Sequence, residues 1–219
     1  PCMDCYHCAA ACPRQAVEVP GLSRAELYPA PSEEPMLAAL QRRRSIRHFS
    51  DELPARAAIQ HALDGAAYAP SGKNEHRNRW IVVYGREKVE ALYRLVLDWA
   101  EPVEHYKHLI WLARKGIDPV TCGASCLIIG YNRPDALNPQ DDTVIATVLA
   151  EQLLAESGLG TCWSGQLEKL ACTREYMPDF ARLIDLPDGM RICGCLMAGY
   201  PAVRFRRLVP RDPLEVFWR

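Results

Sequence analysis

The sequence has almost no net charge and no long hydrophobic run, and each absence excludes a class of protein. Its 26 Lys and Arg residues nearly balance 27 Asp and Glu residues, which gives a formal net charge of −1. Because nucleic-acid binding relies on an excess of basic residues, we expect no nucleic-acid partner. The apolar stretches are too short to span a bilayer, and no signal-peptide pattern opens the chain. We therefore expect a cytoplasmic protein with no membrane partner.

The sequence also lacks internal repeats, low-complexity segments and any arrangement typical of a Ser-His-Asp or Cys-His nucleophile. Its 219 residues are enough for one full domain with a small appendage. Apolar residues make up 49% and charged residues 24%, which is ordinary for a globular protein with a buried core. Function is therefore expected in short local motifs.

Cysteine, by contrast, is abundant, with ten residues, four of them in one run. The run Cys-Met-Asp-Cys-Tyr-His-Cys-Ala-Ala-Ala-Cys covers residues 2–12 and is followed by Pro13. Two-residue gaps let three thiolates converge on one iron–sulfur cube, whereas the fourth, before proline, reaches another cluster in two-cluster ferredoxins. The pattern predicts a 4Fe–4S site with four metal ligands: Cys2, Cys5, Cys8 and Cys12.

Two other uses of this run fit its spacing less well. Structural zinc usually takes two cysteine pairs that a longer loop separates, and a disulfide knot suits a small secreted chain. Because only half of a two-motif ferredoxin is present, we expect an upstream half to be missing here, with one or two clusters in the intact protein. The other six cysteines lie among apolar residues and are expected to pack as small hydrophobes: Cys122, Cys126, Cys162, Cys172, Cys193 and Cys195.

The chain divides into three parts by composition. Residues 1–19 form the ferredoxin-type segment and end in a short β-like run at 15–19. Residues 20–34 form a proline-rich linker, and residues 35–219 form the main domain, in which few strands among many helices favour an α+β layered fold. Periodicity predicts helices at 35–44, 54–67, 86–99, 104–115, 140–157, 166–171 and 174–184, and strands at 80–84, 126–131 and 190–199.

Two arginine clusters stand out against the neutral total charge. The first spans 42–47, at a predicted helix end, and includes Ser45. The second, near the C-terminus, comprises Arg204, Arg206, Arg207 and Arg211. Guanidinium groups match phosphate oxygens in pairs, and a neighbouring serine hydroxyl adds a donor. The clusters would clamp a dianionic phosphate if the fold joined them, although a solvated basic surface gives the same pattern.

Two glycine-containing segments offer backbone N–H groups to a ligand. Residues 69–74 read Ala-Pro-Ser-Gly-Lys-Asn and stand between a predicted helix and a predicted strand. Residues 158–165 read Gly-Leu-Gly-Thr-Cys-Trp-Ser-Gly, where glycines would let the backbone approach a flat ligand closely. Alone, each segment fits a plain turn or loop equally well.

Together and in this order, residues 43–49, 69–74, 158–163 and 199–201 resemble the landmarks of the FMN-dependent nitroreductase family. The resemblance covers residues 35–219, and the leading cysteines are similar to the subgroup in which a 4Fe–4S ferredoxin module precedes the nitroreductase domain. It implies a three-layer α/β/α fold with a small mixed, mainly antiparallel sheet. It also implies a homodimer that binds FMN at the subunit interface.

The resemblance further implies a set of flavin contacts. The positions that contact the phosphate and ribityl chain match Arg43, Ser45 and Arg47. The position at the flavin ring edge matches Arg44. The loop that reaches the flavin from the partner subunit matches Pro70, Ser71, Gly72 and Asn74. The backbone groups that face flavin N5 match Trp163, Ser164 and Gly165.

A late phosphate-binding residue of the family matches Arg211, with Arg207 as the second choice. Lys73, like Arg44, would stabilise the anionic reduced flavin. The chain departs from the family pattern after Asn74, where a Gln-Pro pair is usual and Glu75-His76-Arg77 stands instead. The shape of this substrate-side loop therefore does not follow from the resemblance.

These features predict a flavin enzyme that passes electrons from an iron–sulfur cluster or NAD(P)H through FMN to a small electron-poor acceptor, such as a nitroaromatic or a quinone. External ferredoxin is an alternative donor, and no residue is predicted to be a catalytic proton donor. Two other hypotheses remain: a non-enzymatic iron–sulfur electron carrier, and a flavin-consuming or dehalogenating enzyme on the same fold. The segment at about 98–122, which we expect to be the substrate lid, does not discriminate between these hypotheses. Its aromatic residues fit core packing as well as substrate stacking.

Overall fold

The computed structural model describes residues 6–219, so the predicted ligands Cys2 and Cys5 lie outside the described residues. The chain forms two compact units. One unit spans Arg44–Ala202, and the other joins the residues up to Arg43 with Val203–Arg219. The boundaries predicted at residues 19 and 34 stay a prediction.

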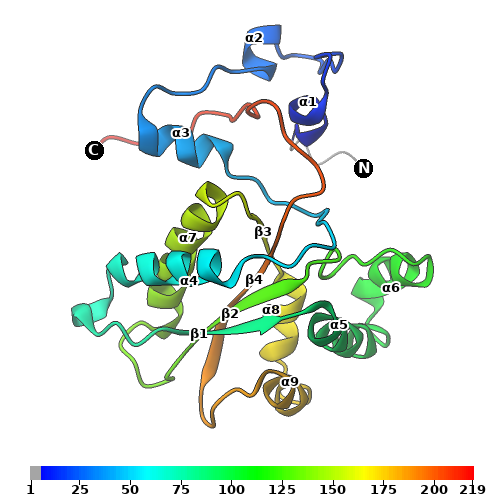
Figure 1. Ribbon diagram of the computed structural model, residues 1–219, viewed down its shortest axis with the longest axis vertical. Helices are drawn as coiled ribbons and strands as arrows, with labels where there is room; N and C mark the ends of the chain where they lie inside the picture. Colours follow the sequence, from blue (N-terminus) through cyan, green and yellow to red (C-terminus); the bar gives the residue numbers. More distant parts are fainter. Residues whose placement is uncertain (1–5) are drawn as a thin grey trace. The chain divides into compact units, whose positions relative to one another are not determined.

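The larger unit is built on one four-stranded sheet in the order β1-β2-β4-β3, with every neighbouring pair antiparallel (Figure 1). The central strands are buried almost throughout, which explains why they read as continuous apolar runs. The predicted mixed sheet is wrong in this respect, since the parallel contact that the described residues make here is an isolated bridge between Ser45 and Thr161. The strands are β1 (Arg79–Tyr84), β2 (Cys126–Asn132), β3 (Gly160–Trp163) and β4 (Arg191–Gly199).

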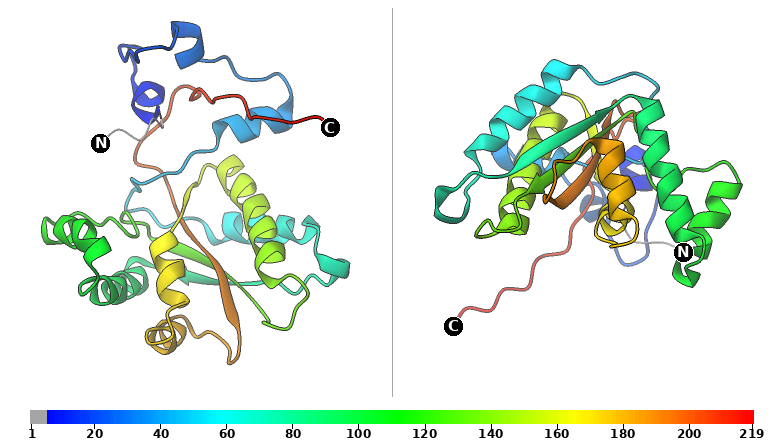
Figure 2. Two further views of the ribbon diagram at one scale, coloured as in Figure 1. Left: turned by 180° about the vertical axis from the view of Figure 1, so that it is seen from behind. Right: turned by 90° about the horizontal axis from the view of Figure 1, so that it is seen from below.

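Helices cover both faces of the sheet and make three layers, as the resemblance implied (Figure 2). Because side chains alternate along a strand, Ile128 faces one helical layer and the neighbouring Leu127 faces the other. The first layer comprises α4 (Arg56–Gly65) and α7 (Pro139–Glu156). The second comprises α5 (Arg86–Ala100), α8 (Gly165–Ala171) and α9 (Met177–Ile184). The α+β fold is thereby confirmed.

The lid region contributes to the core more than to a free surface. Helix α6 (Lys107–Arg114) follows a 3₁₀ turn, η3 (Glu104–Tyr106), and contacts α5. The rings of Trp99 and Tyr106 lie 4.8 Å apart and pack against the buried cluster of this layer. Trp111 is exposed and stacks on His108 at 5.7 Å. Core packing therefore accounts for two of the three lid aromatics.

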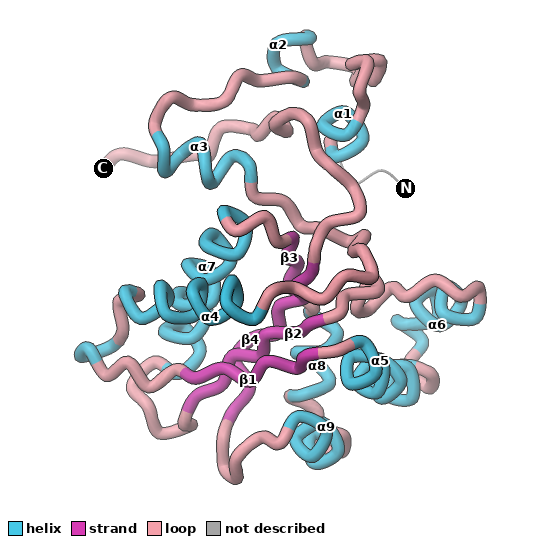
Figure 3. The backbone as a smooth tube through the Cα atoms, in the orientation of Figure 1, coloured by secondary structure: helices cyan, strands magenta, loops and turns pink. Residues whose placement is uncertain are grey.

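The smaller unit contains α1 (His7–Ala11), α2 (Arg24–Leu27) and α3 (Pro35–Arg42). Residues 15–19, predicted as a β-like run, form no strand, and the segment between α1 and α2 is loop in Figure 3. A strand needs a partner for its ladder of hydrogen bonds, whereas the Val17 carbonyl here accepts a bond from the Tyr28 hydroxyl at 2.9 Å. Helix α2 begins with a capping box that Ser23 and Glu26 form inside the predicted linker.

Most predicted elements are confirmed, with ends that differ by about three residues at most. Strand β3 was missed, because four residues that begin with glycine carry little strand signal. Of the six cysteines outside the run, four are buried as expected, Cys122 is half-buried and Cys172 is exposed. Within residues 6–219, no helix has both the length and the apolar character that a membrane crossing requires.

Candidate functional site

The first part of the candidate site is an extended segment, Arg44–Ser50, here called the basic strap. Near its start, Ser45 pairs with Thr161 of β3 in the isolated parallel bridge. At its end, the Ser50 N–H donates to the Tyr200 carbonyl at 2.8 Å, just beyond β4. The strap is therefore fixed to the edge and to the end of the sheet, and its position does not depend on long side chains.

A close backbone approach at Gly160 allows this attachment. The Ile46 N–H donates to the Thr161 carbonyl at 2.8 Å. A Cβ atom on Gly160 would lie 2.6 Å from Cγ1 and 2.9 Å from Cβ of Ile46, closer than real Cβ contacts. Gly160 therefore serves the contact between β3 and the strap, whereas the sequence pattern suggested that this glycine lets a ligand approach.

The strap buries one arginine and exposes the other. Arg44 is buried, Ser45 is half-buried and Arg47 is exposed. Burial raises the pKa of the Cys122 thiol to about 11, the Asp118 carboxylate adds to the rise, and the positive charge of Arg47 opposes it. Arg47 therefore lies near enough to the loop at 118–123 to act on Cys122. An exposed guanidinium beside a serine hydroxyl is a donor set suited to phosphate.

The segment predicted to face flavin N5 lies at the junction of β3 and α8. The Ser164 N–H donates to the Cys195 carbonyl at 2.8 Å, and its Oγ donates to the Val120 carbonyl at 3.2 Å. Both donors of Ser164 thus serve packing in this structure. Gly165 begins α8, and the first N–H groups of a helix have no intrahelical acceptor. The ring of the half-buried Trp163 lies over Gly194 of β4.

Glu151 is a residue of this region that sequence reasoning missed. It is 4% exposed and accepts a hydrogen bond from Thr161 Oγ1 at 2.8 Å. This contact ties α7 to β3 at the point where the strap is attached. The sequence did contain a signal, because Glu151 lies within the apolar stripe of the helix predicted at 140–157. Charged residues are seldom buried without a partner, so an acidic residue in that stripe indicates a buried polar contact.

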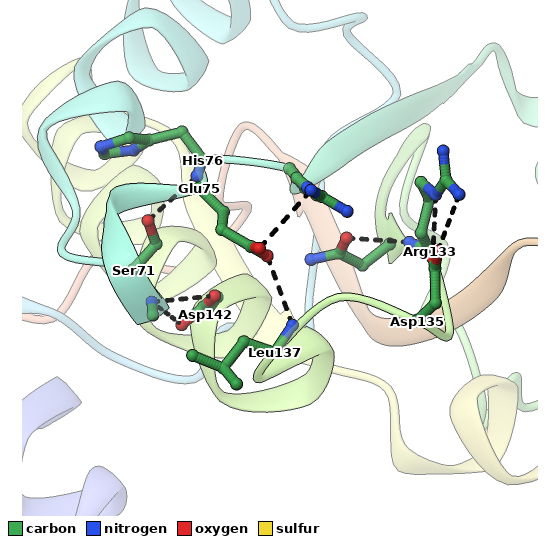
Figure 4. A network of polar contacts seen from close by, with 10 residues as sticks. Ser71, Glu75, His76, Arg133, Asp135, Leu137 and Asp142 are labelled. Carbon is green, nitrogen blue, oxygen red and sulfur yellow. Dashed lines mark hydrogen bonds and ion pairs between the residues drawn. The ribbon is translucent and has the colours of Figure 1, made fainter.

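The second part of the candidate site is the loop Ser71–Arg77, here called the 71–77 loop, which includes η2 (Gly72–Asn74). The Gly72 N–H points to the Asp142 carboxylate, at 3.0 Å from Oδ1 and 3.2 Å from Oδ2 (Figure 4). Asp142 is 5% exposed and lies in the first turn of α7. The loop is therefore docked on the start of α7, with Lys73 and Asn74 exposed at its tip.

The strap and the loop are anchored at different points of the same helix. The loop is bound at Asp142, and the strap is connected through Thr161 to Glu151. These two helix positions are separated by about 13 Å along the axis, at 1.5 Å per residue. Pro70, which precedes the loop, is exposed.

The remaining predicted site residues belong to the smaller unit. The Arg43 N–H donates to the Ala39 carbonyl at 3.2 Å and ends α3. Arg207 donates to the carbonyls of Cys12 and Pro13, at 3.2 Å for Pro13, so its guanidinium contacts the cysteine segment. Arg211 is exposed. The phosphate contacts of these three arginines stay predictions.

Within the cysteine segment, Cys12 accepts a hydrogen bond from the Ala16 N–H, with 3.3 Å between N and Sγ. This bond and further N–H groups, first that of Arg14, lower the pKa of the Cys12 thiol. Cys8 is exposed. Between Tyr6 and Arg219, no group of three or more His, Cys, Asp or Glu side chains gathers in a way that would hold a metal ion.

Comparison with known proteins identifies the family. The profile of the nitroreductase family matches residues 40–200. The match spans most of the larger unit and more than half of the chain, and the chain belongs to the nitroreductase family. It is a flavin oxidoreductase of that family. A comparison with curated proteins gave no match.

Solved structures agree on the fold. A nitroreductase with bound FMN from Desulfitobacterium hafniense is 20% identical, covers 84% of this chain and 97% of its own, and gives a TM-score of 0.71. An FMN-dependent nitroreductase from Clostridium difficile is 19% identical, with coverages of 86% and 100% and a TM-score of 0.69. An iodotyrosine deiodinase bound to FMN and 3-iodo-L-tyrosine is 22% identical, with coverages of 83% and 97% and a TM-score of 0.63.

Proposed function

We propose that the protein binds FMN through the basic strap and the 71–77 loop and reduces a small electron-poor organic molecule, such as a nitroaromatic or a quinone. The observation that carries this proposal is the fixed position of the strap. Its backbone is bonded to Thr161 and Tyr200, so Ser45 and Arg47 are held in place before any ligand arrives. A preformed site of this kind loses less entropy when a charged ligand binds.

The phosphate of FMN would be held by Ser45 and Arg47, with Arg43 and Arg211, or Arg207 in place of Arg211, as further candidates. A charged guanidinium and a hydroxyl supply the short, strong hydrogen bonds that a phosphate dianion accepts. Arg44 and Lys73 would lie toward the flavin ring, where positive charge stabilises the anionic reduced form. The N–H of Gly165 would face the ring from the start of α8.

The protein would act as a homodimer, with Pro70, Ser71, Gly72 and Asn74 of one subunit at the FMN site of its partner. Two observations support a second copy. The loop and the strap are anchored about 13 Å apart along α7 in one chain. In addition, α7 exposes Ile145 and Val148 at 41% and 38%, which leaves an apolar stripe for a partner to cover.

Flavin can accept electrons singly or in pairs, whereas an iron–sulfur cluster accepts them only one at a time. The chain's own residues would bind and orient the flavin and exclude water around it. The donor would be NAD(P)H, an external ferredoxin or an attached cluster. A dehalogenating reaction is a second candidate, because the deiodinase among the similar structures shares the fold.

We also propose that the cysteine run binds a 4Fe–4S cluster when the whole ligand set is present. Cys12 fits this role, since the N–H groups of Ala16 and Arg14 favour its thiolate, and the thiolate is the form that binds iron. Arg207 contacts the same turn through the carbonyls of Cys12 and Pro13. The cluster would supply electrons one at a time. Its ligands lie shortly before the flavin-binding domain in the sequence.

The test of function is an anaerobic assay of the FMN-loaded protein. NADH, NADPH and reduced ferredoxin serve in turn as donors, with a nitroaromatic, a quinone and a halophenol as acceptors. We expect acceptor reduction that depends on added FMN and on at least one donor. Halide release without nitro or quinone reduction would support the dehalogenating alternative. A protein that binds FMN but reduces none of these acceptors would contradict the proposal.

A further inference from the structure

We propose that His76 is a positioning residue that fixes the side-chain amide of Asn74, so that the amide N–H groups at the tip of the 71–77 loop point to the bound flavin or its acceptor. This inference rests on the proposed function and concerns the same site. None of the flavin contacts that the resemblance implies involves His76.

The contact between the two side chains fixes the direction of the amide. His76 Nε2 lies 2.6 Å from Asn74 Oδ1. A carbonyl oxygen only accepts hydrogen bonds, so Nε2 carries the proton and donates it. With Oδ1 directed to the imidazole, the Nδ2 group of Asn74 points the other way, where its N–H groups can donate to a ligand. The contact therefore assigns the Nε2-protonated tautomer to His76 and a donor role to Asn74.

The backbone of the loop makes this contact possible. Lys73, Asn74 and His76 have φ values of 49°, 58° and 46°, in the left-handed region that non-glycine residues seldom adopt. Two short turns hold this backbone, since the Asn74 N–H donates to the Ser71 carbonyl at 3.0 Å and the Glu75 N–H to the Gly72 carbonyl at 3.1 Å. The left-handed residues bring side chains 74 and 76 to the same side.

His76 also closes the loop through its backbone. Its N–H donates to Ser71 Oγ at 3.0 Å, a bond drawn in Figure 4. This N–H and the φ of 46° at His76 together set the closure of the loop. The closure brings the imidazole to Asn74.

The base of the loop is anchored by side-chain contacts as well. Glu75 Oε2 accepts a hydrogen bond from the Leu137 N–H at 3.3 Å, and Glu75 Oε1 lies 3.5 Å from Arg77 (Figure 4). A Cβ on Gly72 would lie 2.8 Å from Asn138 Nδ2, so the loop backbone rests directly on the segment before α7. With the Asp142 contact, these anchors keep the base of the loop in place while the tip carries the polar pair.

The test compares His76→Phe, Asn74→Ala and the double variant, with His61→Phe on the exposed face of α4 as the matched control. Phenylalanine keeps a ring but removes the donor. We expect His76→Phe to leave the melting temperature unchanged and to raise KM for the acceptor, or to weaken FMN binding, roughly fivefold. Asn74→Ala should give a similar change, and the double variant no more than either single one, because His76 acts through Asn74. His61→Phe should change nothing.

Additive losses in the double variant would overturn the inference, as would a His76→Phe variant with unchanged kinetics and FMN affinity. His76→Gln, which restores an N–H donor, should recover part of the loss. A second measurement does not need flavin: the nitrogen chemical shifts of the imidazole in the flavin-free protein report its tautomer. The Nε2-protonated form is expected, and the Nδ1-protonated form would contradict the geometry. Failure of FMN binding in the wild type would reject the proposed function and leave this result standing.

Discussion

The carboxylate of Asp142 accepts a hydrogen bond from the backbone N–H of Gly72, with N–O distances of 3.0 Å and 3.2 Å to its two oxygens. The contact joins the 71–77 loop to the first turn of α7, and the carboxylate is almost fully buried. A buried carboxylate needs such donors, and a glycine is the residue that lets the loop backbone come this close. Asp142 is therefore one of the supports of the loop.

Asp142→Ala should therefore destabilise the protein and loosen the loop. Removal of the acceptor leaves the Gly72 N–H without its partner, which costs about 1–3 kcal/mol for a buried group. Denaturant unfolding measures the free energy, and proteolysis at the loop measures its opening. Asp141→Ala, at the exposed neighbouring position, is the control and should be close to neutral. Equal effects of the two substitutions would show that the contact has no special role.

Gly160→Ala should displace the basic strap. The added methyl group would meet the side chain of Ile46 at 2.6 Å and 2.9 Å, and relief of that overlap costs about 1–3 kcal/mol in a packed region. We expect a lower free energy of unfolding together with weaker FMN binding. Gly165→Ala serves as the stability control, since its Cβ would meet no atom within 4 Å. Normal stability and FMN binding in Gly160→Ala would contradict the described attachment.

The thiol of Cys122 offers a measure of the strap position that needs no flavin. Its pKa is raised to about 11, first by burial and then by Asp118, and Arg47 opposes the rise. Loss of the positive charge in Arg47→Ala should raise this pKa further, so alkylation of Cys122 should begin at a higher pH than in the wild type. Mass spectrometry of the flavin-free protein follows the reaction. Arg133→Ala, at an exposed ion pair with Asp135, should leave the profile unchanged.

The proposed cluster is tested by iron and sulfide content after anaerobic reconstitution. The absorption spectrum separates the cluster band from the flavin bands. We expect Cys8→Ser and Cys12→Ser to lower bound iron several-fold, because each removes a thiolate ligand. Cys172→Ser, an exposed cysteine outside the run, is the matched control. Equal iron content in all three variants would reject the cysteine run as the binding site.

Local patterns in the sequence were sufficient for the seven helices from α3 to α9 and for three of the four strands, because apolar periodicity is a strong signal. Helices α1 and α2, of five and four residues, were not predicted. Strand β3 was not predicted, since its four residues owe their conformation to pairing with β4 and to the approach of Ile46. The run at 15–19 has strand-like composition, but within residues 6–219 no strand pairs with it. A local sequence pattern does not indicate which segments, far apart in the chain, pair with each other.

The same limit applies to the site. The basic strap and the 71–77 loop were found from their residue types, since arginine, serine and glycine have direct chemical meaning for a phosphate and a flavin. Asp142 and Glu151 were not found, because each supports the site through a contact that only the folded chain creates. The role of His76 depends on left-handed backbone conformations, which the sequence Lys-Asn-Glu-His does not predict.

The most direct test of the central claim is the dissociation constant of FMN, measured by flavin fluorescence for the wild type, Arg47→Ala and Arg133→Ala. Charge-assisted hydrogen bonds to a phosphate contribute about 1.5–3 kcal/mol, so Arg47→Ala should weaken binding at least tenfold. Arg133→Ala removes the same charge far from the strap in sequence and should bind FMN as the wild type does. Equal affinity in all three proteins, or no binding in any, would contradict the assignment of the strap as the phosphate site.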